Sequence, residues 1–159
     1  MKTSLTALVV FLAVVSVSAH IMVSPPEAKL GATQKYELRV HNEEKVATAE
    51  VDLTIPEGIT VLSVGTAPAG TYTMSKSGDR ISSVAWKVTV EPGKYLALPF
   101  TAKNPATTQD LHWIVRATFS DGSVVEWGDK PGAKEKASVT KIARQRVNSL
   151  STHDTVATS

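Results

Sequence analysis

The residue with the clearest potential for chemistry is His20, because the nineteen residues before it have the composition of a secretory signal peptide. Lys2 supplies a positive charge, residues 5–15 are almost entirely apolar, and Val17-Ser18-Ala19 is a small-residue cleavage signature. We therefore expect removal of residues 1–19 and a mature chain that begins with His20. The alternative is a membrane anchor, but the apolar run is shorter than the roughly 20 residues that a transmembrane helix needs.

A histidine at the amino terminus offers two nitrogen donors, its α-amine and Nδ1, which can close on one metal ion in a six-membered chelate. The reference pKa values are roughly 8 for the amine and roughly 6.5 for imidazole, so a metal displaces few protons near neutral pH. Amine and imidazole donors in tetragonal geometry favour Cu(II), which heads the affinity order of the divalent ions. His20 is therefore a candidate copper ligand; the alternative is an incidental polar residue at the processing point.

Alternating apolar and polar residues predict the elements that would position such a site. A period of two is typical of strands with one buried face. The expected strands cover 34–41, 47–55, 86–90, 96–102 and 111–120. Asp121-Gly122 predicts a two-residue hairpin turn that joins 111–120 to a strand over 123–128.

About eight short strands separated by turns predict an all-β fold, an immunoglobulin-like or cupredoxin-like antiparallel β-sandwich. We expect a single domain over 20–142, followed by a flexible carboxyl-terminal tail over 143–159 that is rich in Ser and Thr. Trp86 and Trp113 alternate onto apolar faces and are expected in the core. Met22 is also expected to pack in the core, although a thioether two residues after His20 could favour Cu(I).

Composition excludes several other classes of function. The 159 residues include no cysteine, which excludes disulfides, a cysteine nucleophile and thiolate metal sites. The formal net charge is only +2 and no run of Lys and Arg occurs, so nucleic acid is not an expected partner. No Gly-x-Ser-x-Gly, phosphate-binding loop or dinucleotide fingerprint is present.

Four segments in order along the chain resemble the YcnI-like copper-binding domain family. The matching segments are His-Ile-Met-Val-Ser-Pro-Pro-Glu at 20–27, Tyr-Glu-Leu-Arg-Val-His-Asn-Glu at 36–43, Val-Asp-Leu-Thr-Ile-Pro-Glu-Gly at 51–58 and Ser-Asp-Gly-Ser-Val-Val-Glu-Trp at 120–127. The resemblance covers about 20–142, nearly the whole mature domain. It departs from the family pattern at His41, where proline is usual, and in lacking the family's frequent carboxyl-terminal membrane helix.

The resemblance implies that copper is held by the amino-terminal histidine brace, a carboxylate and a tryptophan on a β-sandwich. By position, Trp127 matches the tryptophan and Glu43 matches the carboxylate. Three other carboxylates lie near matching segments and stay open as candidates: Glu27, Glu44 and Glu126. The indole would place its π face near the ion and shield the site from water.

These observations predict a secreted or periplasmic Cu(II)-binding protein of copper trafficking or homeostasis, and not an enzyme. The expected partners are the copper ion and a copper-transport membrane protein or chaperone, with no membrane anchor after signal cleavage. Three alternatives stay open. They are a metal-free immunoglobulin-like binding module, a CopC-like carrier, and a histidine-brace monooxygenase, which would need His41 or His112 as a second imidazole.

Overall fold

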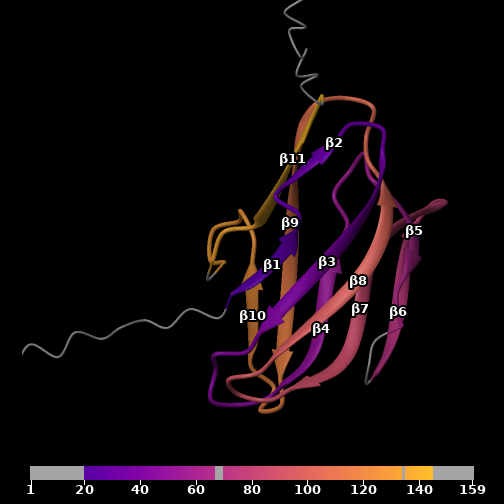
Figure 1. Ribbon diagram of the computed structural model, residues 1–159. Coiled ribbons are helices and arrows are strands. Elements are labelled where there is room, and N and C mark those ends of the chain that lie inside the picture. Colours follow the sequence, from indigo (N-terminus) through magenta and orange to yellow (C-terminus); the bar gives the residue numbers. More distant parts are fainter. Residues whose placement is uncertain (1–19, 67–69, 134, 145–159) are drawn as a thin grey trace, which may run out of the picture.

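The computed structural model describes residues 20–66, 70–133 and 135–144 (Figure 1). The predicted signal peptide at 1–19 and most of the predicted tail, 145–159, lie outside the described residues and stay predictions. Within the described ranges the chain forms eleven strands. They are β1 (Ile21–Ser24), β2 (Glu27–Lys29), β3 (Thr33–His41), β4 (Thr48–Thr54), β5 (Thr60–Val64), β6 (Gly70–Ser77), β7 (Arg80–Val90), β8 (Tyr95–Lys103), β9 (Gln109–Phe119), β10 (Val124–Trp127) and β11 (Ser138–Ala143).

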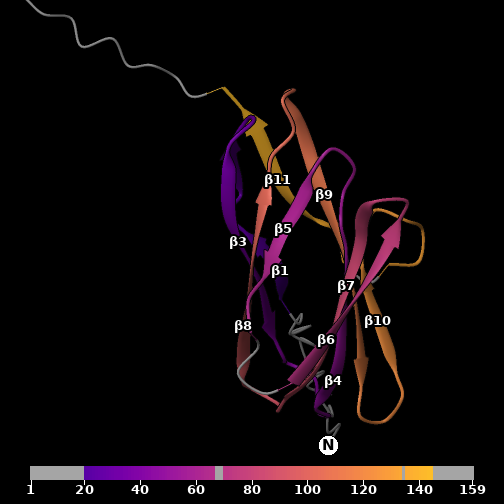
Figure 2. The same cartoon turned by 90° about the vertical axis from the view of Figure 1, so that its right-hand side faces the viewer.

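The strands form two sheets that pack face to face. The smaller sheet has the order β1-β3-β8-β5, and the larger has the order β2-β11-β9-β4-β7-β6, with β10 pairing with β9. Figure 1 shows β3 and β8 crossing in front of β4 and β7, and Figure 2 shows the same layers after a quarter turn. The prediction of an all-β sandwich is confirmed.

The sandwich differs from the prediction in one pairing. Strands β2 and β11 run parallel, with Glu27 opposite Lys141, so the fold is not purely antiparallel. The two strands come from opposite ends of the domain, and no hairpin joins them. Parallel strands need a long connection between them, and here most of the domain provides it.

The core lies between the sheets and is filled by the inward-facing residues of both. Tyr36 of β3, Phe100 of β8 and Trp113 of β9 form an aromatic cluster, with ring centroids 5.2–5.7 Å apart. The indole N–H of Trp113 donates a hydrogen bond of 3.0 Å to Thr140 Oγ1. Trp86 is also fully buried. The predicted core positions of Trp86 and Trp113 are confirmed.

The expected burial of Met22 is wrong. Met22 is 48% exposed, whereas its neighbours Ile21 and Val23 are buried. Successive side chains of a strand point to opposite faces, so a run of three apolar residues cannot be buried against one core. The pairing of β1 with β3 places Ile21 opposite Val40 and turns Ile21 and Val23 inward.

The predicted hairpin after β9 forms, but its loop has three residues rather than two. Phe119 N–H donates to the carbonyl of Ser123, and Gly122 adopts a positive φ of 82°. A three-residue loop ending in a left-handed glycine is the other common hairpin connection. Asp121 accepts hydrogen bonds from the side chain and backbone of Ser123, which lower the pKa of its carboxyl group.

Candidate metal centre

His20 lies at the end of the smaller sheet, directly before β1. Its carbonyl accepts a hydrogen bond of 3.3 Å from the backbone N–H of His41, the last residue of β3. The β1–β3 register thus continues for one residue beyond the strand itself. The His20 side chain is 70% exposed. Its backbone is anchored while its imidazole remains accessible to an incoming ion.

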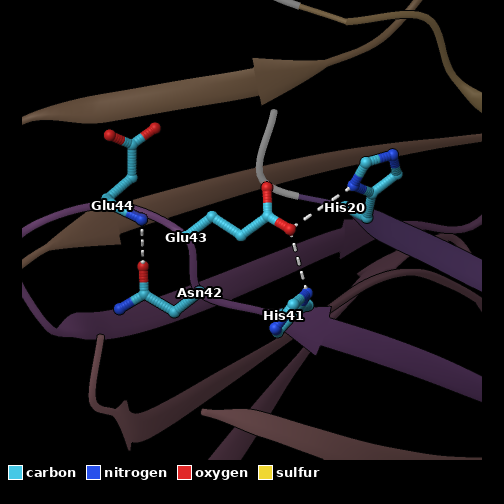
Figure 3. A network of polar contacts seen from close by, with 5 residues as sticks. All are labelled: His20, His41, Asn42, Glu43 and Glu44. Carbon is cyan, nitrogen blue, oxygen red and sulfur yellow. Dashed lines mark hydrogen bonds and ion pairs between the residues drawn. The ribbon is translucent and has the colours of Figure 1, made fainter. Parts of the chain in front are cut away.

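Glu43 brings a carboxylate to this histidine. Its Oε1 lies 3.8 Å from Nδ1 of His20 and 3.3 Å from Nδ1 of His41 (Figure 3). The carboxylate side chain is 17% exposed, far less than the two imidazoles. Among the described residues, none forms a hydrogen bond with its second oxygen, Oε2, which is buried. A buried carboxylate oxygen without a partner is costly, and a bound cation would satisfy it.

The segment that carries Glu43 is held by Asn42. The buried Asn42 amide donates hydrogen bonds of 2.9 Å to the carbonyl of Val46 and 2.7 Å to that of Val90. Its Oδ1 accepts a bond of 2.9 Å from the backbone N–H of Glu44. These contacts fix the turn after β3, so Glu43 presents its carboxylate toward His20 from a rigid support.

The four candidate carboxylates take different places. Glu43 is within ion-pair distance of His20, whereas Figure 3 shows the Glu44 side chain pointing away from it. Glu27 lies in β2, and its pairing partner is Lys141 of β11. Glu126 precedes Trp127 in β10 and therefore faces the other side of that strand. The geometry favours Glu43 for the carboxylate role, which stays a prediction.

Trp127 reaches the same end of the fold from the larger sheet. It is the last residue of β10 and is only 2% exposed. Trp127, His20 and Met22 line a pocket of about 190 Å³, together with Ile21, Glu135, Lys136 and Ser138. His20 therefore has Glu43 as one neighbour and the Trp127 pocket as another. The two other residues that the resemblance assigned to copper, Glu43 and Trp127, therefore both lie near His20.

Side chains do not complete a metal site here by themselves. Across the described part of the chain, no group of three or more His, Asp and Glu side chains is already arranged to hold a metal ion. The missing donor in the predicted set is the α-amine of His20, which exists only after the bond to Ala19 is cut. The arrangement fits a copper ion that uses this amine, Nδ1 of His20 and a carboxylate oxygen of Glu43.

The sequence offered His41 only as the second imidazole that a histidine-brace monooxygenase would need, and the structure places it beside Glu43. The sequence signal for this contact is the spacing of two residues between His41 and Glu43. Residues two apart at the end of an extended strand point to the same face. His112, by contrast, lies in β9 and contacts Asp129 at 2.5 Å beside a different pocket, of about 720 Å³.

Comparison with protein families and curated proteins identifies relatives over most of the chain. A family model described as a domain of unknown function, DUF1775, matches residues 20–144. The copper-binding protein CutI of Bacillus subtilis (strain 168) is 30% identical over 128 residues. The match covers 79% of this chain and 63% of CutI, so the chain spans less than two thirds of that relative.

Comparison with solved structures supports the fold. An uncharacterized Nocardia farcinica protein with an immunoglobulin-like fold superimposes with a TM-score of 0.68 at 23% identity, covering 79% of this chain and 99% of the other. A non-cellulosomal cohesin from Archaeoglobus fulgidus gives a TM-score of 0.50 at 15% identity, covering 79% and 91%. At these identities the likeness concerns the fold alone. The immunoglobulin-like sandwich is confirmed.

Proposed function

The chain belongs to the DUF1775 family, and from this membership we propose that it binds Cu(II) outside the cytoplasm and takes part in copper trafficking or homeostasis. The resemblance to YcnI-like copper-binding domains drawn from the sequence is confirmed by the family match and by the relationship to CutI. The name of that relative supports copper as the ion. The ligands, the carrier role and the location are our proposals.

The observation that carries the proposal is the environment of Glu43. Its buried Oε2 has no hydrogen-bond partner among the described residues, and its Oε1 lies 3.8 Å from Nδ1 of His20. A site of this kind supplies two nitrogen donors from His20 and a hard anionic donor from Glu43, in the turn after β3. Cu(II) accepts both donor types. The carboxylate also neutralises part of the charge of the ion.

We assign Trp127 to shielding. Trp127 is almost fully buried and lines the pocket that His20 and Met22 also line. An indole has no good lone pair for a metal, but its π face attracts a cation and its bulk excludes water. Trp127 would thus close one side of the site, while the exposed His20 leaves the other side open to a partner.

An open face suits a carrier that releases its ion to another protein. The expected recipient is a copper-transport membrane protein or a copper chaperone. We propose no catalytic role, and incubation with ascorbate and a polysaccharide should give no turnover. A metal-free immunoglobulin-like module is the main alternative, and it predicts that the mature protein has no Cu(II) affinity above that of an unrelated β-domain.

The test is a Cu(II) competition titration on the exported protein, after mass spectrometry has shown that its first residue is His20. We expect one equivalent to bind. His20→Ala, or one extra residue ahead of His20, should weaken binding by more than the roughly 10–100-fold typical of losing an outer-shell partner. Glu43→Gln should weaken it as well, while the matched change Glu44→Gln should not. Equal affinity of His20→Ala and the parent would contradict the site.

A further inference from the structure

We propose that His41 supplies a second imidazole to the copper ion, so that the site of this chain contains two histidines rather than one. The inference rests on the proposed copper site at His20 and adds a ligand to it. Three observations support it: the backbone pairing of the two histidines, their distances to one carboxylate oxygen, and the anchoring of the segment between His41 and Glu43.

The backbone places both imidazoles on the same face. Ile21 pairs with Val40, and the next pair outward is His20 with His41, joined by the hydrogen bond from His41 N–H to the His20 carbonyl. Ile21 and Val40 are buried, so the residues next to them in each strand point away from the core. Side chains directly opposite one another in an antiparallel pair have Cβ atoms only about 4.5–5.5 Å apart.

The contacts to Glu43 bring both imidazoles close to one carboxylate oxygen. The Oε1 atom lies 3.3 Å from Nδ1 of His41 and 3.8 Å from Nδ1 of His20. Two donors that each lie about 2.0–2.2 Å from a metal are separated by roughly 2.8 Å when adjacent and roughly 4.2 Å when opposite. The two measured distances lie between these values, so the exposed rings must turn before they and Glu43 can bind one ion. Figure 3 shows both rings in contact with the same oxygen.

Only the exposed groups need to move for the ion to bind. The side chains of His20 and His41 are 70% and 43% exposed, so their rings can turn within the picosecond-to-nanosecond range of surface rotamers. Such a turn is needed, because the described side chains are not yet grouped around a common point. Asn42 stands between His41 and Glu43, and its bonds to Val46 and Val90 hold the backbone in place.

A second imidazole changes what the site can do. The amine and Nδ1 of His20, the imidazole of His41 and the carboxylate of Glu43 make four donors, which fill the plane of a tetragonal Cu(II) ion. A filled plane would leave only the weaker axial positions of the ion open, as closed metal sites are structural and open ones catalytic. The filled plane, and not the number of imidazoles, therefore supports storage or delivery of copper by this chain, because a monooxygenase brace also uses two.

The test counts imidazoles by pulsed electron paramagnetic resonance on the mature protein loaded with one equivalent of Cu(II). In each bound imidazole, the ring nitrogen that does not contact copper modulates the electron spin echo. Combination lines in the resulting spectrum appear when two imidazoles are bound. We expect two in the parent, one in His41→Gln, and two in the matched control His112→Gln, which removes an imidazole from β9. His41→Gln should also lower Cu(II) affinity by at least about tenfold. Circular dichroism checks that each variant is folded.

The outcomes separate this proposal from the one it rests on. A parent protein that binds Cu(II) through His20 with a single imidazole overturns the role of His41 and leaves the proposed function intact. An unchanged spectrum in His41→Gln has the same meaning. A parent protein that binds no Cu(II) overturns both. The parent spectrum gives the number of imidazoles without any variant, and the spectrum of folded His41→Gln shows whether the second one is His41.

Discussion

At the scale of a single residue, Tyr36 shows how burial changes chemistry. Its hydroxyl donates a hydrogen bond of 2.6 Å to Asn104 Oδ1, and burial raises its pKa to about 12. Between the unfolded pKa of 10.0 and this value, the unfolded chain loses the proton that the folded chain keeps. We therefore expect the free energy of unfolding to fall as the pH rises through this window.

Urea unfolding at several pH values between 8 and 12 would measure this effect. Tyr36→Phe should flatten the alkaline decline, while at neutral pH it should cost about 1–3 kcal/mol because Asn104 Oδ1 loses its donor. Tyr95→Phe is the matched control, because Tyr95 is exposed, and it should keep the slope of the parent. If Tyr36→Phe leaves the pH dependence of the unfolding free energy unchanged, groups other than Tyr36 cause the alkaline loss of stability.

Single residues also show where sequence reasoning reached its limit. His20 was identified from the residues immediately before it, since a cleavage signature is local. The link between His20 and Glu43 depends on the register of β1 against β3, which no short stretch of sequence specifies. Glu43 could be preferred over Glu44 only through the resemblance. Met22 was misplaced because three apolar residues in a row leave open which two face the core.

At the scale of elements, the turn after β3 determines how firmly Glu43 is held. We expect Asn42→Ala to destabilise the domain by about 1–3 kcal/mol, because it leaves the carbonyls of Val46 and Val90 without their donor. The freed turn should also weaken Cu(II) binding, since Glu43 would no longer be presented toward His20. Chemical unfolding and Cu(II) titration of the same variant measure the two effects.

Asn104→Ala provides the control for that experiment. Asn104 is also buried, and its amide donates to the carbonyl of Lys29 while its Oδ1 accepts from Tyr36. Its loss should destabilise the domain by a similar amount and leave Cu(II) affinity unchanged. If both variants lose affinity equally, global stability rather than the position of Glu43 controls the site.

The strands that sequence predicted well are those with one buried face. Strands β3, β8 and β9 alternate because one side of each faces the core, whereas the register of β4 shifts between Thr48 and Glu50. Strands β2 and β11 are short, and each pairs with a partner more than a hundred residues away. Local alternation cannot reveal such a pair. The Asp121-Gly122 turn was correctly located, but the dipeptide suits both two- and three-residue loops, so its length was not determined.

At the scale of the whole molecule, a cysteine-free sandwich depends on its core and on any ion that the folded state binds. Because His20 and Glu43 come together only in the fold, Cu(II) should bind the native state in preference to the unfolded chain. Free ion at 100 times the dissociation constant would add about 2.7 kcal/mol, a rise in melting temperature on the order of 10 °C.

Thermal unfolding of the mature protein with and without Cu(II) tests this linkage. His20→Ala should show almost none of the stabilisation at the same ion concentration, because it loses the imidazole of the chelate. His112→Gln should keep all of it, since His112 contacts Asp129 in a separate pocket. Equal stabilisation of His20→Ala and the parent would place the ion elsewhere on the sandwich. Stabilisation that grows with the logarithm of free Cu(II) in the parent would show that the copper site and the fold are thermodynamically linked.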